Sequence, residues 1–405
     1  MNVEQIGKLA VEGQLLNAVQ MQERQQAWLA RGGADDDGSG FTQWLVEQHG
    51  LTDFQAEALM AGVSGPYKLG PYRVSFRLTT GRLGDLFHAE HAELGQPISL
   101  KIFPPAVSRD EKLFARFGRE ARVGLAADHL HVVKTYQVGK VGQVPFIAME
   151  ELYGESLEDR LNRNGRLPYA VACQLIQQAA QGLAYLHAEE IVHRDIRPAN
   201  LWITAHGVLK IIEFGEARDA MSFVDDMDGD ADDPSPSPVG DNLIRIPAGY
   251  YDYVSVEQAE EPASASAAND LYSLGCTLYR CLTGQVPFSD NNPVRQMLRR
   301  ARSTPKSLFE FDPEIPEGVQ EIVSKLLANN PADRYESADD VSQALANVVA
   351  PKPIPELDTV NQEFLEWLQN SPSDNITEYE PEFQDFLEFV SDARFKALMS
   401  GRPTF

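Results

Sequence analysis

Three polar residues with a fixed spacing lie in the segment IVHRDIRPANLWIT and in the LKIIEFGEAR that follows it. Asp195 ends a His-Arg-Asp triplet, and Asn200 follows after four intervening residues. Glu213 comes 13 residues after Asn200 and opens a Glu-Phe-Gly triplet. Carboxylate and amide oxygens suit proton acceptance and the binding of a hard cation such as magnesium. A His-Arg-Asp triplet alone carries little information. The triplet, Asn200 at its spacing and the Glu-Phe-Gly triplet together form a highly specific pattern.

At these residues the sequence resembles the bacterial, eukaryotic-like (Hanks-type) serine/threonine protein kinases. The likeness runs from about Leu69 to Val349. It implies an α+β fold of two lobes, a small β-rich N-lobe and a larger helical C-lobe, and phosphoryl transfer from ATP. In the family pattern Asp195 would accept or orient the proton of the attacking hydroxyl. Asn200 and Glu213 would bind Mg²⁺.

Further residues match the family upstream of this loop. Gly81 and Gly84 lie where the glycine-rich loop belongs, where glycines let backbone amides approach the phosphates. The first glycine of the family pattern is missing. Lys101, in ISLK, would hold the α- and β-phosphates, and Glu120 on the following helix would pair with Lys101 and orient it. Taken alone, both would more often be surface charges.

The resemblance also implies a pocket for the adenine base. Met149 would stand at the back of that pocket. The backbone from Glu150 to Leu152 would form the hinge that meets the base.

Three residues in the walls of the pocket are larger than those of the family pattern. Leu86 replaces the usual Val, Ser99 the usual Ala, and Trp202 the Leu expected beneath the adenine. Overfilling a packed site typically costs about 1–3 kcal/mol, so adenine would fit poorly if the backbone does not move. The alternatives are that the indole of Trp202 turns away or stacks on the base.

Two further departures concern the metal and the helix that carries Glu120. Glu213 replaces the metal-binding Asp, so the carboxylate lies one methylene further out, which predicts weaker magnesium binding or a slower reaction. Gly124 stands where family members place an apolar residue, and Gly118 is nearby. Each glycine weakens a helix by about 1 kcal/mol, which predicts a Lys101–Glu120 pair formed only part of the time.

Three residues are expected to support the fold rather than the chemistry. Glu257 takes the place of the glutamate that ends the activation segment in the family. Asp270 opens a helix, in DLYSLGCTLYRCLTG, from which family members brace the catalytic loop. Arg334, in NPADRY, is the expected buried partner of Glu257.

Composition shifts divide the chain into segments. Apolar residues at helical spacing predict an N-terminal helix over 1–31, and GGADDDGSG predicts a flexible linker over 32–40. A short helical segment is expected over 41–65, and the kinase-like domain over 69–349 has an N-lobe at 69–150 and a C-lobe at 151–349. An insertion over 219–241 holds eight aspartates and no base, which is typical of a solvated loop.

The last segment, 350–405, is expected to be an acidic helical tail. Phe383, Phe386, Leu387 and Val390 follow helical spacing within it. This tail and the N-terminal helices could bind a basic partner or regulate the domain in cis, or they could simply pack on the lobes.

Overall charge and composition exclude several classes of protein. The 405 residues carry a net charge of −25, which repels phosphate backbones and argues against nucleic-acid binding. No apolar run is long enough for a membrane span, and we expect no secretory signal because the first residues lack a basic start followed by an apolar core. Three cysteines without metal-ligand spacing argue against a disulfide framework or a zinc module. We therefore expect a cytoplasmic protein.

Two functions remain open. The first is a serine/threonine kinase that uses ATP and Mg²⁺, slow or regulated, with a protein substrate or signalling partner, a basic protein among the candidates. The second is a pseudokinase that keeps the fold and acts as a conformational scaffold or binding module. The residues Lys101, Glu120, Asp195 and Asn200 favour the first, and the altered pocket walls together with Glu213 favour the second.

Overall fold

The computed structural model describes most of the chain. The described residues are 1–13, 15–48, 50–62, 67–81, 83–141, 144–215, 217, 249–261, 266–290, 292–349 and 360–370. The insertion predicted over 219–241 and the helix predicted near Phe383 lie outside these ranges. Among the helices in these ranges, none combines the length and the apolar character that a membrane crossing requires.

The chain divides into two compact units, and the division does not follow the predicted lobes. The first unit is Met1–Glu111, Tyr136–Glu151 and Thr359–Phe405, and the second is Lys112–Thr135 and Leu152–Asp358. The α+β class expected from the resemblance is confirmed, because the first unit is built on a sheet and the second is mainly helical.

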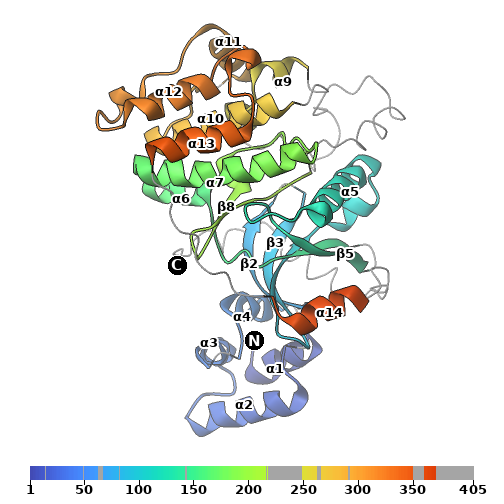
Figure 1. Ribbon diagram of the computed structural model, residues 1–405. Coiled ribbons are helices and arrows are strands. Elements are labelled where there is room, and N and C mark those ends of the chain that lie inside the picture. Colours follow the sequence, from blue (N-terminus) through green and yellow to red (C-terminus); the bar gives the residue numbers. More distant parts are fainter. Residues whose placement is uncertain are drawn as a thin grey trace. The chain divides into compact units, whose positions relative to one another are not determined.

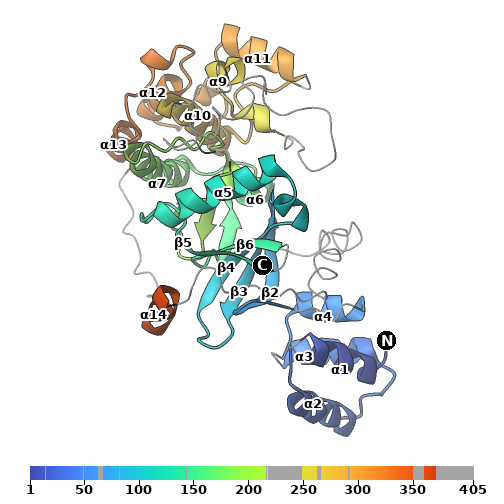
Figure 2. The same ribbon diagram turned by 90° about the vertical axis from the view of Figure 1, so that its right-hand side faces the viewer.

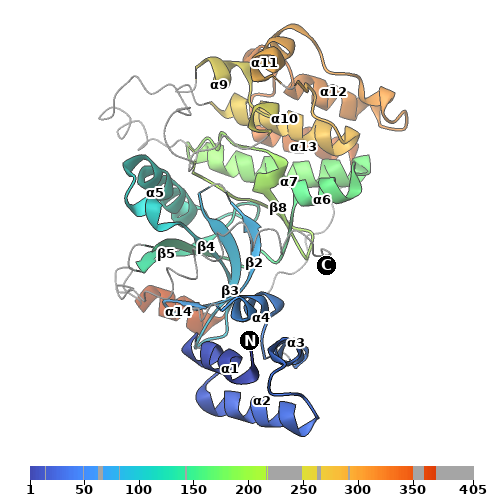
Figure 3. The same cartoon turned by 180° about the vertical axis from the view of Figure 1, so that it is seen from behind.

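A six-stranded sheet forms the centre of the first unit, with strand order β1-β2-β3-β4-β6-β5 (Figure 3). Apolar and polar residues alternate in YRVSFRL, DLFHAEH and ISLKIF, which form most of β2, β3 and β4. The pairs from β1 to β4, and β4 with β6, are antiparallel. The strands are β1 (Lys68–Leu69), β2 (Tyr72–Thr80), β3 (Asp85–His91), β4 (Pro97–Ile102), β5 (Thr135–Val141) and β6 (Val144–Met149), and a short 3-10 helix η1 (Pro105–Ser108) follows β4.

Four helices precede the sheet: α1 (Val3–Glu12), α2 (Ala18–Ala30), α3 (Gly38–Glu47) and α4 (Asp53–Met60). The region predicted as one helix over 1–31 holds two, because Asn17 caps α2 through a reciprocal pair of bonds with Gln20. The predicted linker includes the start of α3, which Asp37 caps by accepting a hydrogen bond from the amide of Gly40 at 2.8 Å.

One apolar core joins three parts of the first unit that are far apart in sequence. It contains residues of α1–α4, of the sheet and of α14 (Gln362–Asn370) (Figure 2). On one side Phe54 of α4 meets Phe87 of β3, with ring centroids 6.3 Å apart. On another side Phe364 of α14 is fully buried and its ring lies 5.7 Å from that of His91.

The second unit is a helical bundle with a small sheet of order β7-β8-β9. Helix α7 packs against α10 and α13 (Figure 1). The elements are α5 (Glu111–Ala126, which begins at the last residue of the first unit), β7 (Gly154–Ser156), α6 (Leu157–Asn164), α7 (Tyr169–Ala188), η2 (Pro198–Asn200), β8 (Leu201–Thr204), β9 (Leu209–Ile211), η3 (Tyr250–Asp252), α9 (Val256–Glu260), α10 (Ala267–Thr283), α11 (Pro293–Arg302), η4 (Leu308–Glu310), α12 (Glu317–Leu326), η5 (Pro331–Asp333) and α13 (Ala338–Val348).

Candidate functional site

The loop before β8 holds the carboxylate of Asp195 between two partners. The amide nitrogen of Asn200 donates to the Asp195 backbone carbonyl at 2.7 Å and to Oδ2 at 2.9 Å. The guanidinium Nε of Arg197 forms an ion pair with Oδ1 at 3.1 Å. These contacts fix the orientation of the Asp195 side chain. A side chain that accepts a proton from a substrate needs such a fixed orientation.

A buried carboxylate on α10 anchors the same loop from behind. Asp270 accepts the backbone N–H of His193 at 2.8 Å and that of Arg194 at 2.7 Å, and the ring of His187 contacts it at 2.9 Å. Burial alone would raise the pKa of Asp270, but its contacts with His187 and His193 outweigh burial and lower it. Asp270 therefore braces the loop as an ionised group, as predicted.

This anchoring holds a strained backbone at Arg194, whose φ is 68°. A non-glycine residue in this region costs about 1–3 kcal/mol, and the surrounding structure must compensate for it. Both backbone polar groups of Arg194 are engaged, because Asp270 accepts its N–H and Gln258 donates to its carbonyl at 3.0 Å. The turn at Arg194 directs the next residue, Asp195.

The two predicted metal ligands lie on neighbouring backbone segments. The amide of Ile212 donates to the carbonyl of Asn200 at 3.0 Å, so Glu213 follows directly after a residue bonded to Asn200. Glu213 also has a positive φ, 71°. The ring of His193 fixes this segment through the Ile212 carbonyl at 3.0 Å and lies 5.5 Å from the ring of Phe214.

Oxygen ligands for a divalent cation are present at these positions. The side chain of Asn200 uses its nitrogen in both hydrogen bonds to Asp195, which orients the amide oxygen away from them. No group of three or more His, Cys, Asp or Glu side chains that could hold a metal occurs in the described ranges. Magnesium is commonly bound through one or two protein oxygens together with substrate phosphates, so the donor set fits that cation.

Trp202 on β8 is buried and hydrogen-bonded to the predicted hinge. Its side chain is 1 % exposed, and its indole N–H donates to the carbonyl of Leu152 at 2.7 Å. Trp202 pairs across the small sheet with Ser156 and Lys210. This hydrogen bond fixes the indole. The Leu152 carbonyl therefore already accepts one hydrogen bond, from Trp202.

In the first unit the strand register gathers four predicted nucleotide contacts on one face of the sheet. Leu86 pairs with Lys101, and Ser99 pairs with Met149. Because side chains alternate along a strand, Ser99 and Lys101 point to the same side, and so do their partners. Gly84 lies beside this face, and an added Cβ there would come within 2.4 Å of the Ile102 carbonyl, so close packing requires this glycine.

The remaining predicted residues are divided between the units. Lys101 is 2 % exposed and lies in the first unit, and Glu120 is 4 % exposed and lies in the second. Their pairing stays a prediction. The boundary between the units falls after Glu151, inside the predicted hinge between Glu150 and Leu152. Gly81 lies in the first unit, between β2 and β3.

The space beside Gly124 is filled. A Cβ added at Gly124 would lie 2.3 Å from Oγ1 of Thr135, whereas one added at Gly118 would meet nothing within 4 Å. The side chain of Thr135 therefore occupies the space that a side chain at position 124 would need. Of the two glycines of α5 (Glu111–Ala126), Gly118 has room for a side chain and Gly124 does not.

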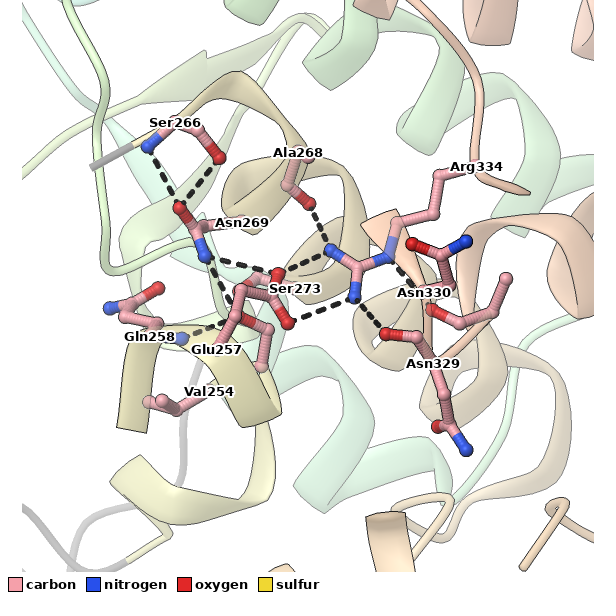
Figure 4. Close-up of polar contacts among 12 residues, drawn as sticks. Val254, Glu257, Gln258, Ser266, Ala268, Asn269, Ser273, Asn329, Asn330 and Arg334 are labelled. Atoms are coloured by element: carbon pink, nitrogen blue, oxygen red, sulfur yellow. Dashed lines mark hydrogen bonds and ion pairs between the residues drawn. The ribbon is translucent and has the colours of Figure 1, made fainter. Parts of the chain in front are cut away.

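The predicted pair of Glu257 and Arg334 is confirmed. The guanidinium donates to both carboxylate oxygens, at 2.5 and 3.1 Å, and also to the carbonyl of Ala268 at 2.8 Å (Figure 4). Asn269 donates to Glu257 at 3.1 Å. Burial opposes the charge of Glu257, but Arg334 outweighs it and lowers the pKa of this carboxyl.

A cavity of about 420 Å³ opens beside the catalytic loop within the second unit. Arg197 and Ala199 of the loop line it together with Asp252, Tyr253 and Arg280. Arg280 makes two bonds of 2.7 Å to Glu158, so its charge is compensated. Sequence reasoning missed this cavity, because its walls come from four separate segments and no local pattern joins them.

Two positioning residues were also missed. His187 supports Asp270, and Gln258 holds the Arg194 carbonyl. The only signal in the sequence is that His187 lies in the last turn of a long apolar helix, six residues before His193. That spacing predicts no contact without knowledge of where α10 lies.

Known proteins of one family are similar in sequence to this chain. Residues 72–346 match the model of the protein kinase domain. A probable serine/threonine-protein kinase of Streptomyces coelicolor is 34% identical over 285 residues, which cover 69% of this chain and 39% of the relative. The serine/threonine-protein kinase PknB of Mycobacterium tuberculosis is 31% identical over 292 residues, 71% of this chain and 43% of the relative.

PrkC of Bacillus subtilis, also a serine/threonine-protein kinase, is 30% identical over 272 residues, which cover 67% of this chain and 39% of the relative. The matched part thus spans less than half the length of each of these relatives.

Proposed function

Because the chain belongs to the protein kinase family, we propose that it transfers the γ-phosphoryl group of ATP to serine or threonine hydroxyls of proteins. The observation that carries this proposal is the geometry of Asp195, whose carboxylate is held by Asn200 and Arg197. A carboxylate has lone pairs enough to accept a further hydrogen bond from a substrate hydroxyl. Asp195 orients that hydroxyl and receives its proton as the phosphoryl group is transferred.

Asn200 and Glu213 would hold magnesium through their side-chain oxygens. When bound, the cation would neutralise charge on the phosphates. The bonds from the Asn200 amide nitrogen to Asp195 couple the metal ligand to the proton acceptor. A change in one therefore displaces the other, which makes this pair the centre of the proposed mechanism.

The sheet of the first unit would bind the nucleotide. Lys101 would contribute a positive charge toward the phosphates, and Glu120 would orient it. Leu86, Ser99 and Met149 would contact the base from the same face of the sheet. Gly81 and Gly84 keep side chains away from the phosphates, and Glu150 and Leu152 would meet the edge of the base.

Proteins are the substrates that the family implies, and we propose that basic ones are favoured. The net charge of −25 attracts basic segments at low ionic strength. We also propose a cytoplasmic location, which the three cysteines support because all are buried, unpaired thiols.

A transfer assay tests the proposal directly. The full chain is incubated with radiolabelled ATP, magnesium and either a basic or an acidic test protein, and phosphoserine and phosphothreonine are measured. We expect transfer by the unaltered chain and a loss of about 10²–10⁴-fold in Asp195→Ala, because a general base contributes that much. Asp128→Ala is the matched control, since its carboxylate belongs to a side chain 80 % exposed and paired only with Lys134.

The same assay resolves the alternative function. Undiminished transfer in Asp195→Ala would contradict the proposed mechanism. Absence of transfer by the unaltered chain, together with a rise in melting temperature on adding ATP and magnesium, would instead assign the chain as a pseudokinase. Glu213→Asp is expected to raise the rate at low magnesium, because the shorter side chain restores the family's ligand position.

A further inference from the structure

Helix α11 carries a basic outer face in an otherwise acidic protein. Arg295, Leu298, Arg299 and Arg302 are spaced as i, i+3, i+4 and i+7, which places them on one face. The side chains of Arg295 and Arg299 are 69 % and 62 % exposed, Leu298 is 46 % exposed, and Arg302 is exposed as well. We call these four residues the α11 face.

The opposite side of α11 fixes the helix to the segment that ends the insertion. Arg300 is fully buried and donates to the carbonyl of Tyr251 at 2.6 Å, and Gln296 donates to the carboxylate of Asp252. Arg300 and Gln296 thus hold the inner side of α11 against η3, and the α11 face points away from these contacts.

The charge of the α11 face is only partly compensated. Asp290 is the acidic partner of both Arg295, at 3.3 Å, and Arg299, at 3.6 Å. Among the described residues this carboxylate pairs with two of the three arginines, so the α11 face carries two more positive charges than Asp290 compensates. The helix dipole accounts for cations in the last turn but disfavours Arg295, which lies in the first turn. The face therefore favours an acidic ligand with several carboxylates.

We propose that the α11 face binds the acidic insertion of this same chain, residues 219–241. The insertion holds eight aspartates and no base, so its charge is complementary. Its chain returns to the described structure at Gly249, whose carbonyl accepts the amide of Asp252 at 3.0 Å, directly beside the residues that α11 holds. The occupant is therefore attached next to its site.

Chain length permits the contact. Asp241 lies eight residues before Gly249, and Asp233 lies sixteen residues before it. When fully extended, these two stretches of chain reach up to about 28 and 55 Å. A helix of ten residues is only about 15 Å long, so both aspartates can reach any part of α11. A tethered segment acts at an effective concentration in the millimolar range, which favours it over an acidic segment of another protein.

Carbodiimide cross-linking of the full chain tests this proposal independently of catalysis. Replacing the three arginines with lysine (Arg295→Lys, Arg299→Lys, Arg302→Lys) keeps the charge and supplies amines that join to nearby carboxylates. We expect amide bonds between these lysines and aspartates of 219–241 at low salt, and their loss at 0.5 M NaCl because salt screens exposed charges. Arg166→Lys is the positive control, since Arg166 lies 3.7 Å from Asp312.

Two results would overturn the proposal. The first is formation of the control link to Asp312 with none to 219–241. The second is a link found only between two molecules when isotopically labelled and unlabelled protein are mixed, which would assign the face to a second copy of the chain.

A peptide experiment separates the internal occupant from an acidic segment of a partner. A fluorescent peptide of residues 219–241 is titrated against the unaltered chain and against a full chain whose eight aspartates in this segment are replaced with asparagine. We expect binding at least tenfold tighter to the altered chain, because its α11 face is vacated, and no binding when Arg295, Arg299 and Arg302 are changed to glutamate. Equal binding to both chains would show the face open to external ligands.

Discussion

Asp270 concentrates three polar contacts on one fully buried carboxylate, and two of them hold the backbone of the loop that carries Asp195. Its depressed pKa means that the charged form is favoured in the folded state. A group of this kind contributes stability above its unfolded pKa, and that stability is lost as the pH falls through the folded value. Asp270 therefore contributes its full stabilisation of the loop at neutral pH.

Replacing Asp270 with asparagine should destabilise the protein by about 3–5 kcal/mol, because it removes a buried charge whose partners stay in place. An asparagine accepts at one atom only and presents an N–H₂ to the amides of His193 and Arg194. Urea unfolding at pH 7 measures the change, with Asp128→Asn as the exposed control. A loss below 1 kcal/mol would mean that these bonds contribute little to the fold.

His131 also makes the folded state less stable as the pH falls, but in a higher pH range than Asp270. It is 2 % exposed, and burial lowers its pKa from 6.5 to about 4, against the opposing hydrogen bond to the Leu209 carbonyl. Between these values the unfolded chain binds more protons, so stability falls as the pH is lowered from 6.5 toward 4. The shift corresponds to up to about 3 kcal/mol.

We expect His131→Asn to flatten this dependence while keeping a donor near Leu209. Urea unfolding at pH 7 and at pH 5 measures the free energy of unfolding of the unaltered chain and of His131→Asn. His91→Asn serves for comparison, since burial also lowers the pKa of His91. An unchanged difference between the two pH values in His131→Asn would show that other groups carry the titration.

At the scale of elements, α5 is the helix in which local sequence and packing disagree. Gly118→Ala should stabilise the protein by about 0.5–1 kcal/mol, because the added methyl meets open space and the helix loses a flexible residue. Gly124→Ala should destabilise it, because the methyl would overlap Thr135. Urea midpoints of the two variants measure the difference.

A rescue separates overlap from backbone effects at Gly124. The double variant Gly124→Ala, Thr135→Ala removes the hydroxyl that the new methyl would meet at 2.3 Å, leaving a contact of 3.2 Å to the Cβ of Thr135. We expect it to be more stable than the sum of the two single changes indicates. Additivity of the two effects would mean that the clash is relieved elsewhere.

The elements around the catalytic loop show which features are predictable from sequence. Glu257 and Arg334 are predictable as a pair because each lies in a motif of fixed spacing, and the structure confirms the pair. The bond from Trp202 to the Leu152 carbonyl is not, since a backbone carbonyl carries no residue-type signal. Thr135 beside Gly124 is likewise a contact between segments that pattern alone does not join.

At the scale of the whole molecule, the sequence predicts helices at both ends but not what they cover. An apolar stripe indicates that a helix face is buried without naming its partner. In the structure Trp367 of α14 lies 4.4 Å from the ring of His91, and Gln55 of α4 donates to the carbonyl of Val74 at 3.0 Å. Helices predicted as flanking segments are therefore part of the core that supports the sheet.

This shared core predicts that the first unit unfolds as one cooperative piece. Phe54→Ala should cost about 3–5 kcal/mol, because Phe54 is 1 % exposed and its ring packs against Phe87. Native-state hydrogen exchange should then accelerate together in α1–α4, in β2–β4 and in α14, because regions that open as one unit share one opening free energy. Helices α7 and α10 of the second unit should keep their protection.

The matched control is Val323→Ala in α12, where the side chain is 1 % exposed within the second unit. It should accelerate exchange in α7, α10 and α12 and leave the sheet protected, because α12 packs against α10 and α13 of the second unit. If Phe54→Ala accelerated exchange in α1–α4 alone, the N-terminal helices would be a separate domain that merely contacts the sheet. Acceleration that includes the strand carrying Lys101 would instead make these helices structural supports of the nucleotide-binding face, so that a change far from the proposed chemistry would weaken ATP binding.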